Sequence, residues 1–342
     1  RLTDDERANL EAEGRAWALR FAIPEHRDVD FDDLVKGPQH FENDALRDFV
    51  IVRSDGSPTY LLASGVDDLR MGMTHVIRGE DLLPSTPRQM LMFEALGEPA
   101  PRYAHLPLIL GADRAKLSKR HGAVAVEWFR DHGFLPDALV NYLALLGWSP
   151  GNNEEILPRD ELVRRFDLAA VSRHPAIFDT EKLTWMNGEY LRMLSDEEAA
   201  AGMLTALSEG GLVADLDVLR AIAPHVKTRM KRLDEAPIML QFLFTDSVEL
   251  DEKARAAVDK VGPEYLRGAA ERLEGVDPWT VEGITAALDD VAASAQLNRT
   301  KGWQPVRAAV TGTTISPPLP ESLELLGRDE TVGRLRAAAG TE

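Results

Sequence analysis

Cysteine is absent from the 342 residues of the sequence. Disulfide bonds and cysteine-ligated metal sites are therefore excluded, and the eight histidines are dispersed rather than spaced as zinc ligands. We accordingly predict no metal site and no protein-bound zinc. Because disulfides are rare in reducing compartments, a chain without cysteine fits the cytoplasm. The polar, acidic residues 1–6 also predict no secretory signal, so we expect a cytoplasmic protein.

Long apolar runs are missing as well. No stretch of 18 or more consecutive apolar residues occurs, which argues against a membrane-spanning helix and predicts no membrane partner. Aromatic residues make up only 6% of the chain, but a hydrophobic content of 44% and a charged content of 28% are typical of globular proteins. At this length we expect two or three domains with an ample buried core.

Basic residues are outnumbered by acidic ones. The chain has 39 Lys and Arg against 57 Asp and Glu, a formal net charge of -18. This balance argues against an indiscriminate nucleic-acid binder, because phosphate binding depends on clustered Lys and Arg. It does not exclude an acidic protein that contacts RNA through local patches. Two such patches are present, at 114–120 and at 227–232.

The patch at 114–120 holds four cations within seven residues. It follows 104–111, a run that reads as a short buried strand. A basic loop at the end of a buried strand is where open α/β sheets present groups to a ligand. Lys116, Ser118 and Lys119 are spaced to converge on a polyphosphate and to stabilise charge developing on it. Taken alone, such a loop is more often a solvated surface feature.

The N-terminal part of the chain predicts one helix and two strands. Residues 3–14 form a helix whose capping box pairs Thr3 with Glu6. A polar, poorly periodic stretch follows to about Asp48, for which we predict no element. The apolar runs 49–53 and 59–63 flank an Asp-Gly turn, and we predict two strands joined by a tight loop.

The next segment predicts a βαβ crossover. A strand at 74–78 leads to a helix with Thr86 at its N-cap, Pro87 at its first position and Gly97 at its end. The chain then returns to the strand at 105–110. Strand, helix and strand at this spacing indicate a parallel sheet.

Beyond the basic loop the pattern becomes helical. Residues 136–146 form a strongly apolar helix that Gly147 ends, and helix starts lie at 195–198 and 277–280. No strand signal of comparable strength follows residue 150, and no repeat of 20 to 50 residues is evident. The second half is therefore predicted to be α-helical.

The order and spacing of many motifs resemble those of bacterial glutamyl-tRNA synthetases, which are class I aminoacyl-tRNA synthetases. The resemblance is dense over 45–195 and weaker to residue 338. It rests on Asp55–Tyr60, Val66–Asp68, Met71–Asp81, Ser85–Gln89, Ala104–Gly111, Lys116–Gly122, Gly133–Pro136, Asn141–Ser149, Phe178–Asp179 and Lys182–Gly188.

The resemblance implies a glutamate–tRNA ligase. Such an enzyme activates L-glutamate with ATP and Mg2+ to glutamyl-adenylate and transfers the glutamyl group to the 3′ end of tRNA(Glu). The implied partners are tRNA(Glu), ATP and L-glutamate, and full-length members of the family are usually monomeric. The helical C-terminal half is unlike the β-barrelled anticodon domain of glutaminyl-tRNA synthetases. It is also missing from the short tRNA-modifying glutamyl-queuosine relatives.

The implied fold is an α/β partial nucleotide-binding (Rossmann-like) fold, followed by an all-α stem-contact region and an α-helical anticodon-binding module. The expected domain boundaries are 1–45 for the remainder of an acceptor-binding insertion, 46–112 for the second half of the nucleotide-binding fold, 113–194 for the signature loop and stem-contact region, and 195–342 for the anticodon-binding module.

By resemblance, residues 116–120 form the class I signature loop. Lys119 is then the catalytic residue, contacting ATP and stabilising charge on the α-phosphate as pyrophosphate leaves, which is a sound electrostatic role for an ammonium. Lys116, Ser118 and Lys119 are expected to bind ATP, together with Asp81 near the nucleotide.

The glutamate site is expected around Arg78. Its guanidinium matches the family's arginine that holds the substrate's side-chain carboxylate through two parallel hydrogen bonds. Tyr60 matches the tyrosine that lines the pocket, and Ser64 falls where related enzymes often carry a polar pocket residue. Without the resemblance, Arg78 would be read as a strand-end ion pair with Glu80 or Asp81, and Tyr60 as a core aromatic.

The tRNA contacts are expected in the second half. Lys227 and Arg229 are implied to meet the anticodon arm, and a solvated helix face is the alternative. Arg307 and Thr311 lie in a segment that resembles one near the anticodon, which could equally serve packing.

The other class I signature, His-x-Gly-His, is missing from the sequence. In the family it precedes everything recognised here, so we expect a synthetase chain without its first half-fold. Either the chain is a fragment, which the close match of the retained motifs favours, or it has lost catalysis. The alternative function is therefore a non-catalytic tRNA-binding protein. Half a parallel sheet would expose a strand edge, so poor stability or association with a partner is expected.

Overall fold

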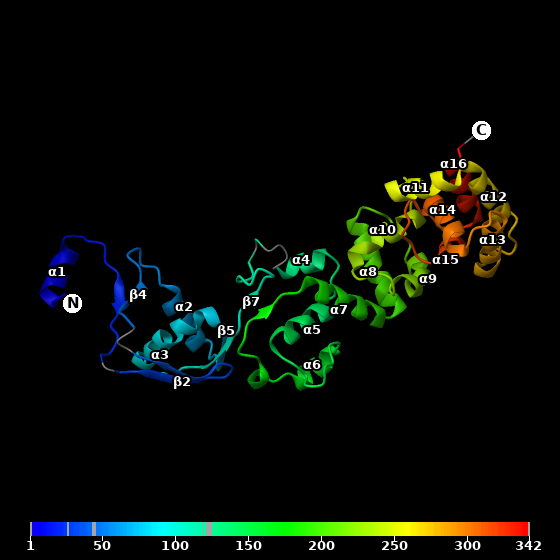
Figure 1. The fold of residues 1–342 in the computed structure, drawn as a ribbon. Coiled ribbons are helices and arrows are strands. Elements are labelled where there is room, and N and C mark those ends of the chain that lie inside the picture. The colour runs from blue at the N-terminus through cyan, green and yellow to red at the C-terminus, as the bar shows by residue number, and fades with distance from the viewer. Residues whose placement is uncertain (1, 26, 43–45, 119, 121–124, 341–342) are drawn as a thin grey trace. The chain divides into compact units, whose positions relative to one another are not determined.

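The computed structural model describes residues 2–25, 27–42, 46–118, 120 and 125–340 (Figure 1). The chain folds into two compact units. The first comprises residues 1–122 and 143–179, and the second comprises residues 123–142 and 180–342. The predicted division into four domains stays a prediction.

The first unit combines short strands with helices. Its elements in chain order are α1 (Asp4–Ala12), β1 (Leu19–Phe21), β2 (Val29–Asp33), β3 (Gly37–Phe41), β4 (Phe49–Val52), α2 (Tyr60–Arg70), β5 (His75–Gly79), the 3-10 helix η2 (Glu80–Ser85), α3 (Thr86–Ala95), β6 (Arg102–Leu106), β7 (Ile109–Leu110), α6 (Arg159–Arg165), the 3-10 helix η4 (Leu168–Ala170) and β8 (Ala176–Ile177). The helix α5 (Pro136–Gly147) crosses the division between the units at residue 143.

Two predictions for this unit are confirmed. The helix α1 begins with the capping box between Thr3 and Glu6. The strands β5 and β6 pair in parallel around α3, which is the predicted βαβ crossover. The predicted strand at 105–110 is divided at Pro107 into β6 and β7, because proline has no N–H to donate to a ladder. Thr86 is the first residue of α3 rather than its N-cap, which is Ser85.

The prediction of a strand at 59–63 is wrong. Only β4 forms, and the second apolar run begins the helix α2. Its apolar residues Leu61, Leu62, Val66 and Leu69 continue at helical spacing beyond the five residues considered, so the short window concealed the period. The Thr59 hydroxyl donates to the carbonyls of Val50 and Ile51, at 3.1 and 3.3 Å, which ties the helix start to β4.

Residues 19–41, for which no element was predicted, form three strands. The strands β2 and β3 pair antiparallel, with Val29 opposite Phe41 and Asp33 opposite Gly37. Along β2, buried or half-buried residues alternate with the exposed Asp30 and Asp32. The alternation was present in the sequence, but its acidic content obscured it. The hairpin also joins β6, since the Leu34 N–H donates to the Tyr103 carbonyl at 2.9 Å.

The second unit is helical in the part that the structure describes. Its elements are α4 (Val126–Asp131), α7 (Thr180–Met193), α8 (Asp196–Glu209), α9 (Leu216–Val226), the 3-10 helix η5 (Leu233–Glu235), α10 (Ala236–Leu240), the 3-10 helix η6 (Gln241–Leu243), α11 (Glu252–Val261), α12 (Pro263–Glu274), α13 (Val281–Ser294), α14 (Arg299–Thr311), α15 (Leu319–Leu326) and α16 (Arg328–Ala338). The predicted helix starts are confirmed: Ser195 and Glu198 form a capping box, and Thr280 caps α13.

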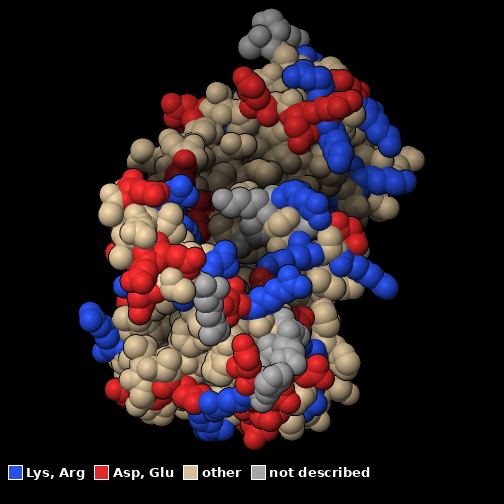
Figure 2. Space-filling model, turned by 90° about the vertical axis from the view of Figure 1, so that its left-hand side faces the viewer, with Lys and Arg blue, Asp and Glu red and all other residues tan. Residues whose placement is uncertain are grey.

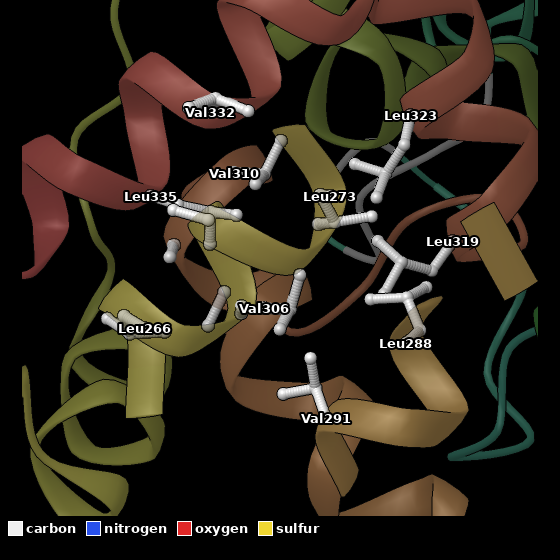
Figure 3. Close-up of a cluster of buried hydrophobic side chains, with 14 of the residues drawn as sticks. Leu266, Leu273, Leu288, Val291, Val306, Val310, Leu319, Leu323, Val332 and Leu335 are labelled. Atoms are coloured by element: carbon white, nitrogen blue, oxygen red, sulfur yellow. The ribbon is translucent and has the colours of Figure 1, made fainter. Parts of the chain in front are cut away.

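Aliphatic side chains from six helices, α11 to α16, form the main core of this unit, part of which is shown in Figure 3. Leu266 and Leu273 of α12 point toward residues of α13, α14, α15 and α16. A second cluster joins α7, α8, α9 and α10. The first unit has smaller clusters, one of which packs Val35 and Ala104 with Trp148 and Leu157. Burial of these side chains provides most of the stabilisation of each unit.

Charged side chains of both signs lie side by side on the face shown in Figure 2. Among the residues described, no helix is long and apolar enough to cross a membrane.

Candidate functional site

The parallel register of β5 and β6 places Arg78 directly opposite His105. Residues two apart on a strand share a face, so Tyr103 and His105 lie on the same side of the sheet. The guanidinium carbon of Arg78 lies 5.2 Å from the centre of the Tyr103 ring. Burial raises the pKa of Tyr103 to about 12, and its hydroxyl has no hydrogen-bond partner within the described part of the chain.

Arg78 is half-buried and held by three side chains. Its Nε donates to His105 Nε2 at 3.0 Å, its Nη1 to Gln89 Oε1 at 2.8 Å, and its Nη2 to Thr86 Oγ1 at 2.8 Å. Gln89 and Thr86 both come from α3, which follows β5 in the crossover. The guanidinium is thereby fixed on three nitrogens by neutral groups.

The alternative interpretation of Arg78 as a strand-end ion pair is wrong. Glu80 pairs with Lys36, and Asp81 pairs with Lys116 at 2.6 Å. Within the described ranges, Arg78 itself forms no ion pair. The nearby carboxyl of Asp68 makes no direct pair with it either: burial raises the pKa of Asp68, and the charge of Arg78 only partly opposes that rise.

Gln89 also connects Arg78 to Ser64. Its Nε2 donates to Ser64 Oγ at 2.9 Å, and Ser64 Oγ donates to the Tyr60 carbonyl at 2.8 Å. Two of the three predicted glutamate-binding residues, Arg78 and Ser64, thus share one network. Tyr60 is linked to it only through its backbone, and its side chain is 55% exposed, which excludes the core-aromatic alternative.

A buried acid lies behind His105. Asp33 Oδ2 is 2.6 Å from His105 Nδ1, and both side chains are inaccessible to solvent. Burial alone would raise the pKa of Asp33, but hydrogen bonds from the Lys36 backbone, from His105 and from Val35 outweigh it and lower the pKa. Burial lowers the pKa of His105, and the partial opposition of Asp33 does not reverse this.

The basic loop is anchored beside β7. Leu110 bridges Lys116, and Leu117 N–H donates to the Ile109 carbonyl at 2.9 Å. Arg114 has a φ of 61°, the left-handed conformation that a tight turn demands. Lys116 and Ser118 therefore leave the sheet next to the end of β7, as predicted for residues at the end of a buried strand.

Two of the predicted ATP-binding residues contact each other. The ion pair with Lys116 lowers the pKa of Asp81, and both side chains are exposed. Such an exposed pair contributes little stability, so it can open to admit a ligand. Lys119, the predicted catalytic residue, lies outside the described residues.

The predicted tRNA-binding residues belong to the second unit. The side chain of Lys227 is 16% exposed, pairs with Asp196 at 2.8 Å and donates to the Leu194 carbonyl at 2.7 Å. The alternative of a solvated helix face is therefore wrong for Lys227. This ion pair also fixes the start of α8, because Asp196 is its first residue.

Arg229 and Arg307 meet at one backbone carbonyl. Each donates from Nη1 to the Ser316 carbonyl at 3.3 Å, and Arg307 also donates to Ser316 Oγ and to the Pro317 carbonyl. Burial, followed by the nearby charge of Arg229, lowers the pKa of Arg307 to about 10. Thr311 is buried, and its hydroxyl lies 3.0 Å from the carbonyls of Arg307 and Thr313.

No group of three or more His, Cys, Asp or Glu side chains in the described part of the chain is arranged to hold a metal ion.

Comparison with known proteins places these residues in a family. The profile of "tRNA synthetases class I (E and Q), catalytic domain" matches residues 1–185, and that of "Anticodon binding domain" matches residues 193–339. A glutamate–tRNA ligase of Thermobifida fusca is 46% identical over 335 residues, which are 95% of this chain and 70% of that protein. The chain belongs to the glutamate–tRNA ligase family. The predicted class, a class I aminoacyl-tRNA synthetase and thus a ligase, is confirmed.

Other members of the family agree. The glutamate–tRNA ligase of Moorella thermoacetica is 40% identical over 99% of this chain and 71% of its own length. The crystal structure of a glutamate tRNA ligase from Elizabethkingia meningosepticum, in complex with its amino acid, matches with a TM-score of 0.81 and 31% identity. The match covers 99% of this chain and 71% of the Elizabethkingia meningosepticum chain. The predicted fold class is thereby confirmed.

Sequence reasoning missed four residues of the network in this glutamate–tRNA ligase chain: Asp33, Thr86, Gln89 and His105. Thr86, Gln89 and His105 lie inside motifs that carried the resemblance, but no spacing rule links them to Arg78. Asp33 belongs to a hairpin for which no element was predicted. If the alternation of apolar and acidic residues along β2 had been recognised, it would have indicated that Asp33 faces inward.

Proposed function

We propose that this chain binds L-glutamate, ATP with Mg2+ and tRNA(Glu) and acts in ATP-dependent glutamylation of the tRNA. The observation that carries the proposal is the Arg78 guanidinium, which is half-buried, held by neutral groups and in no ion pair among the residues described. A charge held in this way is suited to a carboxylate ligand, and it disfavours an uncharged amide.

In this proposal the predicted site residues contribute to binding different parts of the substrates. Arg78 holds the side-chain carboxylate of glutamate, and Nη1 supplies the hydrogen that Gln89 does not use. Ser64 accepts a hydrogen bond from Gln89, and the exposed Tyr60 side chain lines the substrate pocket. Lys116, Ser118 and Lys119 bind the phosphates of ATP, with Lys119 stabilising charge on the α-phosphate and Asp81 near the nucleotide.

The predicted tRNA contacts remain part of the proposal. Arg229 and Arg307 provide a pair of guanidinium groups, and Lys227 and Thr311 support the segments that carry them through their buried hydrogen bonds. Two guanidinium groups beside one another attract phosphate or base acceptors.

Glutamate-dependent exchange between ATP and pyrophosphate, measured with tRNA(Glu) present, tests the function. We expect exchange with L-glutamate and far less with L-glutamine. Lys119→Ala should reduce the rate at least about a hundredfold, as removal of one charge-stabilising donor does. Arg78→Gln should raise the KM for glutamate about a hundredfold or more, because it removes a desolvated charge partner.

Arg102→Gln is the matched control. Arg102 is an exposed arginine on the neighbouring strand β6, and its loss should leave exchange unchanged. Tight binding of tRNA(Glu) without any exchange would contradict the proposed catalysis and favour the non-catalytic tRNA-binding protein.

A further inference from the structure

A line of three buried or half-buried polar groups runs from the β2–β3 hairpin to the predicted substrate-binding arginine. Asp33 of β2 contacts His105 of β6, and His105 contacts Arg78 of β5. Asp33 is 3% exposed and His105 is 0% exposed. Three elements that are distant in sequence thus converge behind one guanidinium.

The partners of His105 fix the position of its proton. Arg78 Nε always carries a hydrogen, so His105 Nε2, at 3.0 Å, must accept it. The Thr86 hydroxyl lies 3.1 Å from the same nitrogen and can donate to it as well. The remaining nitrogen, Nδ1, faces the Asp33 carboxylate at 2.6 Å and must donate. The ring is therefore neutral, with its proton on Nδ1.

Asp33 is built to remain ionised in this position. Its Oδ1 accepts the backbone N–H groups of Val35, Lys36 and His105 at 3.0, 2.8 and 3.1 Å. A carboxylate with this many donors is stabilised in its charged form, although it is buried. It is consequently a permanent acceptor for His105 Nδ1, and the tautomer of the ring cannot invert without losing that bond.

A fixed acceptor matters to Arg78 because an arginine side chain is long and flexible. A guanidinium donates to a carboxylate in its own plane, so this plane has to be set before the ligand arrives. Gln89 and Thr86 hold the two terminal nitrogens, and His105 holds Nε. Loss of the hydrogen bond at Nε would allow the guanidinium plane of Arg78 to rotate.

We propose that Asp33 and His105 are positioning residues that lock the imidazole as the Nδ1–H tautomer and thereby fix the Arg78 guanidinium for the side-chain carboxylate of glutamate. This inference rests on the proposed function for the substrate, but its structural part stands on the hydrogen bonds alone. It gives the β2–β3 hairpin, for which the sequence predicted no element, an indirect part in substrate recognition, through His105 and Arg78.

The tautomer is measured directly by nitrogen-15 NMR of the imidazole rings in the full chain. The His105 signals are identified by their loss in His105→Gln. We expect a neutral ring with its proton on Nδ1 at pH 7.5, and inversion to the Nε2–H tautomer in Asp33→Asn if the asparagine amide faces Nδ1. A wild-type ring protonated on Nε2 would overturn the proposal without bearing on the ligase function.

The effect on substrate recognition is tested by comparing the KM values for glutamate and for ATP in the exchange reaction. Asp33→Asn should raise the KM for glutamate about tenfold or more, the loss expected for one hydrogen bond to a charged group, with the KM for ATP within about twofold of wild type. Asp32→Asn is the matched control, because Asp32 is the adjacent, exposed residue of the same strand. Equal glutamate KM values in Asp33→Asn and Asp32→Asn would overturn the proposal.

A second pair of variants covers the case in which Asp33→Asn does not fold. His105→Gln retains an amide oxygen that can accept from Arg78, whereas His105→Leu retains none. We expect His105→Gln to bind glutamate more tightly than His105→Leu at equal thermal stability. Indistinguishable glutamate KM values for the two would overturn the proposal. If the wild-type chain shows no glutamate-dependent exchange, the proposed function fails and the NMR result still decides the tautomer.

Discussion

We expect His105 to make the proposed recognition of glutamate sensitive to the protonation of one ring nitrogen. The charged or titratable groups around its ring are Asp33 of β2, Lys36 after β2, Arg78 of β5 and Tyr103 of β6. Protonation of Nε2 would place an N–H against Arg78 Nε–H. Burial, with Arg78 and Lys36 contributing, lowers the pKa of His105, so this occurs below the ordinary value of about 6.5.

We therefore expect the KM for glutamate to rise as the pH falls below about 6.5, while the KM for ATP changes less. The free energy of unfolding changes in the same direction. Because the pKa of His105 is lower in the folded state, the stabilisation by neutral His105 is present above the unfolded-state pKa and is lost as the pH falls. Glutamate KM values between pH 5 and 8 test this. A flat profile in wild type, or the same profile in His105→Gln, would contradict it.

Arg229 offers a test of tRNA binding at the same scale. It is exposed, and the only hydrogen bond from its side chain to a described residue is the 3.3 Å contact with the Ser316 carbonyl. Arg229→Ala should weaken binding of tRNA(Glu) by about 1–3 kcal/mol, as loss of one arginine contact to nucleic acid does. Arg267→Ala, which removes a partly exposed arginine of α12 in the same unit, should not weaken it. A filter-binding titration compares them, and equal affinities would contradict the role of Arg229.

At the scale of elements, one buried arginine of α16 joins this helix to several other segments of the second unit. Arg334 is 7% exposed and donates to the carbonyls of Phe242 and Val310 at 2.9 Å and of Thr245 at 2.6 Å. Its Nε donates to Glu330 at 2.6 Å. A single side chain thus satisfies carbonyl groups from several segments, which would otherwise be left without donors.

Arg334→Met should lower the free energy of unfolding of this unit by about 3–5 kcal/mol, because it leaves buried acceptors and one carboxylate unpaired. Urea denaturation followed by circular dichroism measures the change. Arg336→Met, on the same helix with an exposed ion pair to Glu274, should cost less than about 1 kcal/mol. A similar cost for both variants would show that the buried hydrogen bonds of Arg334 contribute little.

At the scale of the whole molecule, two units with separate cores predict two unfolding steps. The main core of the second unit joins six helices, whereas the first unit is held by smaller clusters. We expect the first unit to unfold at lower urea concentration, because less apolar area is buried there. Tryptophan fluorescence and circular dichroism should then give different midpoints. Coincident curves would contradict two steps, and Arg334→Met should move only the later one.

The sequence by itself determined the family, the βαβ crossover and the capped helices, because these depend on local order: turn residues, helix caps and motifs in series. It also identified Arg78 and Ser64 as candidates. It could not reveal that Asp81 and Lys116 pair with each other, that Lys227 is buried in an ion pair, or that Thr311 is enclosed.

Only the tertiary structure decided how Arg78 is held. Its partners come from β6 and α3, and the acid behind them comes from a hairpin more than 40 residues upstream. Such contacts follow from sheet register and from the packing of distant elements, which short-range spacing does not encode. The run at 59–63 was mistaken for a strand for a different, local reason: five residues do not distinguish the two periods, whereas Val66 and Leu69 farther along α2 continue the helical spacing.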